Sequence, residues 1–354
     1  MLKSINYLTN RNQYISSFSY DYIYYISSPL WITFLVLYLD RSHILNYFIT
    51  SNMNLGDALL ELTAVGHLFS VYIRTFTSKY FINKFPKRIV LFPLILIYLN
   101  LFHPYIGFVI TSIGFAWDAY HSSMQTFGFG QILDARKKIY TEDSRIFDWA
   151  LNVIVYMGLL GLSKNWSDYF SIFETVLMSN KIIPHPFIGN IQGLFQTFCL
   201  VSVVLSLILY VAYYAYLKIK HNIFSIHKHL LYLFTFIACY FAFIKTSNFF
   251  ISLLIVNAFH ALQYWALVAY TENKEIERKH PEFKLTGFFA SSLSIAFIIA
   301  LTAILIILKL QFNPYSNQFL NHPFASIYMA IYSSTAFIHF YFDSFIWSVK
   351  EKSV

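Results

Sequence analysis

Apolar segments of about 20 residues recur along the whole chain, and this length matches the thickness of a lipid bilayer. Ten such segments are present, over the approximate ranges 22–39, 57–77, 88–103, 105–133, 146–163, 190–217, 226–245, 249–271, 285–310 and 325–349. A helix satisfies its backbone hydrogen bonds internally, so it is the conformation that such segments adopt in lipid. The pattern predicts an all-α fold: a polytopic transmembrane helical bundle of about ten helices, with residues 1–354 as a single integral membrane domain.

The amino-acid composition supports lipid as the main solvent of this chain. Of its 354 residues, 57% are hydrophobic and only 12% are charged, whereas about 25% of the residues in an ordinary soluble domain are charged. There are too few polar side chains to cover a soluble surface of this size. We therefore expect membrane lipids to be the principal partners, and we do not read the net charge of +8 as a sign of nucleic-acid binding.

The basic residues instead follow the order of the connecting loops. If the N-terminus is cytoplasmic, 20 of the 25 Lys and Arg residues belong to the cytoplasmic side. The other side then holds only Arg41, Lys164, Lys181, Lys245 and Lys309. This asymmetry is what the positive-inside rule requires. It predicts that both termini are cytoplasmic, and we expect a bacterial inner (plasma) membrane as the location.

Four of the predicted helices carry one histidine each near their middle: His67, His121, His260 and His339. With a rise of about 1.5 Å per residue, each lies about 15–18 Å from one end of its helix. That is close to the midplane of a hydrocarbon core about 30 Å thick. The four helices also run in the same predicted direction. Because ionisable groups at this depth are costly and usually functional, we expect the four imidazoles to converge on one metal ion.

Two carboxylates lie at helical spacing from these histidines. Asp118, His121 and Gln125 share one helix face, and Asp343 follows His339 by one turn. A carboxylate one turn from a histidine can ligate the same metal or orient the imidazole. We expect Asp118 and Asp343 to tune or supplement the histidine ligands.

The helix that carries His260 has further polar side chains on the same side. Asn257, Gln263 and Tyr264 surround this histidine at helical spacing. We expect Tyr264 to supply a proton or a hydrogen bond during the reaction. Asn257, Gln263 and Gln125 are expected to orient the imidazoles from outside the set of ligands, as carboxamides do around metal sites. Gln125 and Gln263 can equally serve as hydrogen bonds between helices.

Histidines in a dry interior indicate redox chemistry. Neutral imidazoles suit iron, copper, zinc and nickel, and a site with poor access to water favours iron or copper over hydrolytic zinc. Non-haem iron is the cofactor that we expect, with copper or haem as alternatives. A midplane site is reached through lipid, so the expected substrate is apolar. The sequence thus predicts a metal-dependent oxidoreductase or oxygenase that acts on an isoprenoid-like or lipid-like molecule and is served by an electron-donor protein.

The four histidines His67, His121, His260 and His339 resemble the ligand set of the Brp/Blh-type membrane carotenoid-cleaving dioxygenases. In that family, four histidines on membrane helices bind a single non-haem iron. The resemblance lies in this constellation and not in a run of matching sequence. It implies cleavage of a carotenoid as the reaction. This chain differs from the family's pattern because no helix carries a His-x3-His pair and because its predicted helix count is larger.

Other interpretations of the same residues remain open. Midplane histidines and aspartates can relay protons in a proton-coupled transporter, or a haem can lie between two of the histidines in an electron-transfer protein. They can also form unrelated structural hydrogen bonds. The run His227–Lys228–His229 belongs to a basic loop, and we expect these three side chains to be solvated.

Overall fold

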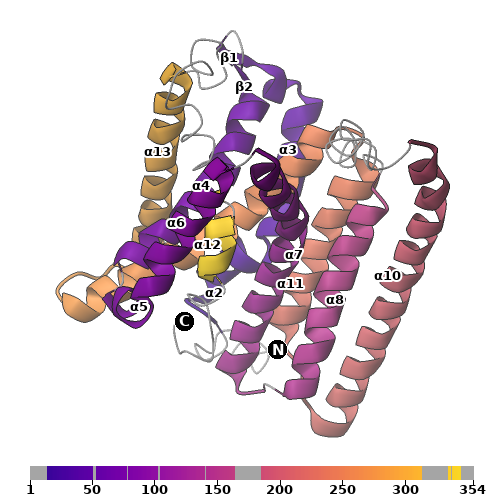
Figure 1. Ribbon diagram of the computed structural model, residues 1–354. Coiled ribbons are helices and arrows are strands. Elements are labelled where there is room, and N and C mark those ends of the chain that lie inside the picture. Colours follow the sequence, from indigo (N-terminus) through magenta and orange to yellow (C-terminus); the bar gives the residue numbers. More distant parts are fainter. Residues whose placement is uncertain are drawn as a thin grey trace. The chain divides into compact units, whose positions relative to one another are not determined.

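The computed structural model describes residues 14–50, 53–77, 79–102, 104–139, 141–163, 185–312, 334–335 and 337–343, and Figure 1 traces them along the chain. These residues are almost entirely helical, which confirms the predicted all-α class. The exception is a small antiparallel hairpin of β1 (Phe48–Thr50) and β2 (Met53–Asn54).

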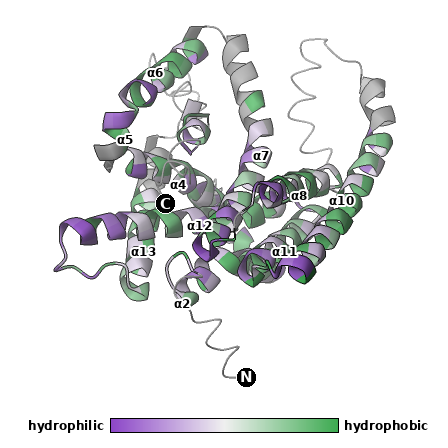
Figure 2. Ribbon diagram, turned by 90° about the horizontal axis from the view of Figure 1, so that it is seen from below, coloured by the Kyte–Doolittle hydropathy of each residue, from purple (hydrophilic) through white to green (hydrophobic). Residues whose placement is uncertain are grey.

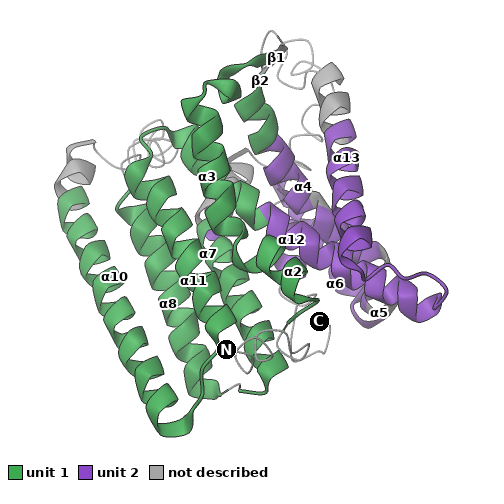
Figure 3. Cartoon of the chain, turned by 180° about the vertical axis from the view of Figure 1, so that it is seen from behind, with its two compact units in different colours: residues 1–60, 119–260 green, residues 61–118, 261–354 purple. Residues whose placement is uncertain are grey.

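The chain forms two compact units, coloured separately in Figure 3. Unit 1 comprises residues 1–60 and 119–260, and unit 2 comprises residues 61–118 and 261–354. Unit 1 contains, wholly or in part, α2 (Phe18–Tyr20), η2 (Asp21–Ile26), α3 (Ser28–Arg41), η3 (Ile44–Asn46), α4 (Leu55–Thr77), α7 (Pro104–Lys137), α8 (Glu142–Gly161), α10 (His185–His221), α11 (Ile226–Tyr240), η4 (Phe241–Lys245) and α12 (Phe249–Lys279). Unit 2 contains α5 (Lys79–Lys84), α6 (Pro86–Phe102), α13 (Phe288–Phe312), the remaining parts of α4, α7 and α12, and the helical residues 337–343.

Each predicted membrane span overlaps a helix, although the last predicted range, 325–349, lies mostly outside the described residues. Within the described part, three helices are long and apolar enough to cross a membrane: Gln192–His221, Ile226–Lys245 and Phe249–Lys279. A fourth is added if the pair Phe18–Ile26 and Ser28–Arg41, bent by 54°, counts as one span. Figure 2 shows how apolar α10 is along its described length. Membrane association is therefore supported, whereas the ten-span topology stays a prediction.

Close helix packing in unit 1 depends on two glycines of α8. A Cβ added at Gly158 would lie 2.4 Å from Cγ2 of Val203, and one added at Gly161 would lie 2.6 Å from Sγ of Cys199. Both neighbours belong to α10, one turn apart. Small residues allow two helix backbones to approach closely, which is how helices associate where no hydrophobic effect drives them together. This contact fixes α10 against α8.

Two short connections close the same end of unit 1. The connection from α7 to α8 passes through Lys138, which has a left-handed φ of 57°. The helix α8 then begins with a capping box, in which Oγ1 of Thr141 accepts from the backbone N–H of Ser144 at 3.1 Å. The connection from α10 to α11 passes through Asn222, also left-handed at φ 52°, a conformation that asparagine tolerates better than most residues. These turns determine which residues of α7, α8, α10 and α11 lie at this end.

Aromatic stacking and a tight glycine contact organise unit 2. The ring of Tyr341 stacks on Phe92 of α6 with centroids 3.9 Å apart, and Phe342 meets Tyr72 of α4 at 5.9 Å. A Cβ added at Gly66 of α4 would lie 2.7 Å from the ring of Trp265. These contacts hold residues 337–343 against α4 and α6, and hold α4 against α12.

Candidate metal centre

Unit 2 brings two of the predicted ligands together. His67 of α4 and His339 are both buried, and their ring centroids are 4.3 Å apart. The ring of Tyr264 from α12 lies 4.5 Å from that of His67 and 5.5 Å from that of His339. An ion pair fixes α4 against α12 two turns further along, where Nη1 of Arg74 lies 2.6 Å from Oε1 of Glu272. Three side chains that are distant in sequence therefore form one compact group.

Asp343 completes this group. The hydroxyl of Tyr264 donates to Oδ1 of Asp343 at 2.6 Å, and Nε2 of His339 lies 3.3 Å from Oδ2 of the same carboxylate. The carboxylate thus orients a phenol and an imidazole at the same time. Asp343 and Tyr264 thus lie beside His339, and their predicted roles at a metal stay predictions.

The separation of the nitrogen and oxygen atoms is suitable for two ligands of one ion. Atoms that each lie about 2.1 Å from a metal are about 3.0–3.4 Å apart at octahedral or tetrahedral angles. The 3.3 Å between Nε2 of His339 and Oδ2 of Asp343 falls in this interval. The donor set of imidazole and carboxylate is also one that iron and zinc accept. The residues present in unit 2 therefore fit a metal ion.

Unit 1 contains the other two predicted ligands. His121 of α7 and His260 of α12 are buried, with ring centroids 5.5 Å apart and planes at 75°. The Nε2 of Gln125 donates to the backbone carbonyl of His260 at 3.0 Å. Gln125 therefore fastens α7 to α12 beside the histidine pair. This bond is of the interhelical kind that the sequence left open for Gln125.

The remaining predicted residues have different environments. Gln263 of α12 is completely buried. Asn257 is partly buried and donates to the carbonyl of Leu253 in its own helix at 2.9 Å. Asp118 is exposed, unlike the four histidines. The predicted orienting roles of Asn257 and Gln263, and the predicted role of Asp118 in tuning or supplementing the ligands, stay predictions.

Among the residues that the structure describes, histidine and carboxylate side chains are grouped so that they could hold a metal ion. Each unit contributes one histidine pair, as described above. The convergence of all four histidines on a single ion stays a prediction.

The expectation for the run His227–Lys228–His229 is wrong. Lys228 and His227 are buried at 1% and 0% exposure, and Nδ1 of His229 lies 2.9 Å from the hydroxyl of Tyr210. Nε2 of His227 lies 3.1 Å from the hydroxyl of Tyr14, whose pKa burial raises to about 12. The run begins α11 and turns into unit 1, because polar partners on other helices replace the solvent.

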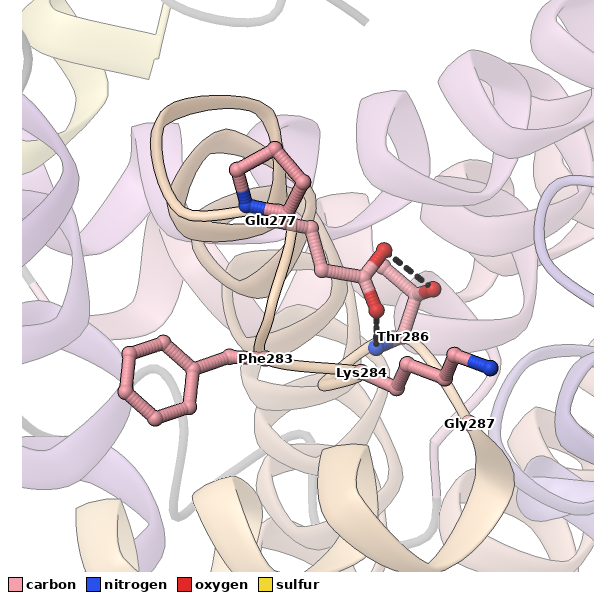
Figure 4. Close-up of a pocket in the computed structure, with 6 residues that line it drawn as sticks. Glu277, Phe283, Lys284, Thr286 and Gly287 are labelled. Atoms are coloured by element: carbon pink, nitrogen blue, oxygen red, sulfur yellow. Dashed lines mark hydrogen bonds between the residues drawn. The ribbon is translucent and has the colours of Figure 1, made fainter.

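A cavity of about 480 Å³ lies elsewhere, where α12 leads into α13 (Figure 4). It is lined by Glu277, Pro281, Phe283, Lys284, Thr286 and Gly287. The carboxylate of Glu277 accepts from the backbone N–H and from the hydroxyl of Thr286, both at 2.8 Å. These bonds close the turn, so the carboxylate serves the loop. The lining contains none of the predicted ligands.

Comparison of the chain with protein-family models, with curated proteins and with solved structures gives no match.

Proposed function

We propose that this protein is a membrane-embedded, metal-dependent oxidoreductase or oxygenase that acts on an apolar substrate. The observation that carries the proposal is the group of the buried His67, His339 and Tyr264 with the partly buried Asp343, and its 3.3 Å nitrogen–oxygen separation. Burying two imidazoles and a carboxylate away from water is unfavourable unless a partner offsets it, and a metal bound by them does so. For the pair His121 and His260 of unit 1, metal ligation is proposed from the sequence pattern alone.

Non-haem iron is the metal that we propose, with copper or haem as the alternatives. When bound, iron supplies the one-electron and oxygen chemistry that side chains cannot perform. His67 and His339 hold the metal, and the carboxylate of Asp343 orients His339 or ligates beside it. The hydroxyl of Tyr264 donates to Oδ1 of Asp343, so Tyr264 would hold a proton beside the residues that would bind the metal.

The proposed substrate is isoprenoid-like or lipid-like, and an electron-donor protein supplies reducing equivalents where the reaction needs them. Support comes from the surroundings of the ligands. Phe340 lies 5.7 Å from the ring of His339, and Phe342 and Tyr72 pack nearby. Aromatic walls bind an apolar chain and keep water away from the metal. Cleavage of a carotenoid is the specific reaction that the resemblance implies.

The decisive experiment is elemental analysis of detergent-purified protein, combined with an optical spectrum. We expect about one iron per chain and no intense haem absorption. His339→Ala and His67→Ala should each lose most of the metal. His280→Ala is the matched control, because this histidine is exposed and contacts Glu282 at the protein surface; it should retain the metal. Full retention in both ligand variants would contradict the proposed centre.

Proton-coupled transport is the second candidate, and one observation favours it. Tyr264, Asp343 and His339 form a continuous chain of polar contacts, which is also what a proton relay needs. The test uses the purified protein in liposomes with an imposed pH gradient. The transporter is favoured if wild-type protein contains no metal and takes up a solute in response to the pH gradient. His339→Ala should then lose this uptake.

We further propose the topology behind this function: ten spans, both termini in the cytoplasm, in a bacterial inner membrane. It is supported by the distribution of Lys and Arg and by the helices found at the predicted ranges. Single cysteines at Lys84 and at Ser42 should react with a membrane-impermeant reagent from opposite sides. Labelling of both from one side would contradict the topology.

A further inference from the structure

A second buried polar cluster lies in unit 1, away from the histidine pair of that unit. Lys228, at the start of α11, places its ammonium between two carboxylates. Its Nζ donates to Oδ2 of Asp134 on α7 at 2.5 Å and to Oδ2 of Asp148 on α8 at 3.0 Å. The three side chains are 1%, 2% and 0% exposed. One positive charge is thus shared by two carboxylates out of contact with water.

The two carboxylates have different hydrogen-bond environments. Asp148 also accepts from the hydroxyl of Tyr214 at Oδ1, at 2.8 Å, and from Nε2 of Gln131 at Oδ2, at 2.9 Å. Asp134 has Lys228 on Oδ2, but its Oδ1 is buried and meets no hydrogen-bond donor among the described residues. Hydrogen bonds to a carboxylate stabilise its charged form. Asp148 is therefore the carboxylate that stays ionised, and Asp134 is the one that can accept a proton.

The balance of charge points in the same direction. With both carboxylates ionised, the three side chains carry one excess negative charge in a low-dielectric interior. Two carboxylates in one site do not ionise equally, because each disfavours the charge of the other. Burial raises the pKa of Asp134 to about 6, although Lys228 opposes the shift. Addition of one proton to Asp134 leaves a neutral pair of Lys228 and Asp148.

The charged and titratable groups around Asp134 come from four helices. They are Lys137 on α7, Asp148 on α8, Tyr210 and Tyr214 on α10, and His227, Lys228, His229 and Tyr232 on α11. Lys137 is half-buried, one turn beyond Asp134, and its charge favours the ionised carboxylate. The hydroxyl of Tyr232 lies against α7 at Gly130, where an added Cβ would be 2.0 Å away. The cluster is therefore tightly enclosed on its α11 side.

We propose that Oδ1 of Asp134 is a proton-binding site, which takes up one proton per chain from the solvent at the end of unit 1 where α7 ends and α11 begins. In the step, a carboxylate oxygen forms an O–H bond with a proton donated by hydronium, and water is released. The proposed proton site does not depend on the proposed oxidoreductase function. Its ligand is the proton itself, and its occupancy changes the net charge of the cluster from −1 to zero.

The test is infrared difference spectroscopy of the full-length purified protein, recorded across the acidification of the sample. Other carboxyls of the chain can also protonate in this range, so the Asp134 band is defined as the carboxylic-acid carbonyl band with a midpoint near pH 6 that wild-type protein gains in excess of Asp134→Asn. It should amount to one carboxyl group per chain, and the variant should lack it. Glu282→Gln is the control, because this carboxylate is exposed; its band pattern near the midpoint should match that of wild type. Persistence of the band in Asp134→Asn would overturn the proposal.

A second variant tests the site without removing it. Lys137→Gln takes away a nearby positive charge, which disfavours the ionised carboxylate, so the midpoint should rise by about half a pH unit. The exposed Lys279→Gln should leave the midpoint unchanged. An unchanged midpoint in Lys137→Gln, or a shift to lower pH, would show that the band does not come from Asp134.

Discussion

The two units bury polar groups in different ways. In unit 1 the ammonium of Lys228 lies between Asp134 and Asp148, so that opposite charges meet directly. In unit 2 the carboxylate of Asp343 is contacted by the phenol of Tyr264 and the imidazole of His339. A phenol and a neutral imidazole carry no charge.

This difference separates a cluster that carries its own cation from one that is suited to an added cation. Lys228 already offsets much of the cost of removing carboxylates from water, and only a proton is left to bind. The contacts of Asp343 include no side chain with a permanent positive charge, so a metal ion or a proton gains the most there. Burial alone therefore does not identify a metal site, whereas the kind of contact does.

The largest expected effect is that of removing the cation of unit 1. Lys228→Met leaves Asp134 and Asp148 buried without their shared ammonium, and loss of one partner from a buried ion pair costs about 3–5 kcal/mol. Denaturant unfolding in detergent should show this loss. Lys279→Met, at a half-exposed position, is the matched control and should be nearly neutral. Equal stability of the two variants would mean that the cluster is solvated.

A smaller effect is expected from pH. The pKa of Asp134 in the folded protein, about 6, exceeds the value of about 3.9 in an unfolded chain. The folded state therefore binds this proton more tightly. The resulting stabilisation is fully present below the unfolded pKa and is lost as the pH rises through about 6. It amounts to about 1–3 kcal/mol. As the pH is raised from about 4 to about 7, the melting temperature of wild type should fall relative to that of Asp134→Asn. An equal change of melting temperature with pH in the two proteins would contradict the raised pKa of Asp134.

In unit 2, Tyr264→Phe tests the contact that orients Asp343. Removal of the hydroxyl takes a hydrogen bond from Oδ1 of a largely buried carboxylate, which should cost about 1–3 kcal/mol. If Asp343 ligates the metal, the loss should be smaller for metal-loaded protein than for protein treated with a chelator. Tyr38→Phe, at an exposed position, should be neutral. Equal losses with and without metal would argue that Asp343 is not a ligand.

The smallest effect is expected at the surface. Arg278 contacts Glu275 at 2.7 Å, but its side chain is 73% exposed. Such pairs contribute about 0–1 kcal/mol because water and salt screen them. Arg278→Ala should lower the melting temperature only slightly, and less still at high salt. If Arg278→Ala lost as much stability as Lys228→Met, the effect of Lys228→Met would come from charge pairing as such and not from burial of the pair.

The ranges predicted from the sequence coincide with helices of the structure, but some of them end before the helix does, where the chain becomes polar. The predicted range 226–245 coincides with α11 and η4, because an apolar run in lipid has no stable alternative to a helix. By contrast, the range 249–271 stops short of the end of α12 at Lys279. Glu275 pairs there with Arg278 and Lys279 at helical spacing. Such pairs stabilise a helix outside lipid, where hydropathy carries no signal.

The sequence alone determined the all-α class and the approximate positions of the helices. It also determined which helices carry the histidines. They depend on the length and periodicity of apolar runs, which are local properties of the chain. Only the tertiary structure decided the environment of Lys228, read from sequence as a solvated loop residue. Its partner Asp134 is 94 residues away. A charged side chain at a helix end turns toward water or inward according to the groups that other helices place beside it, and those groups become neighbours only when the chain has folded.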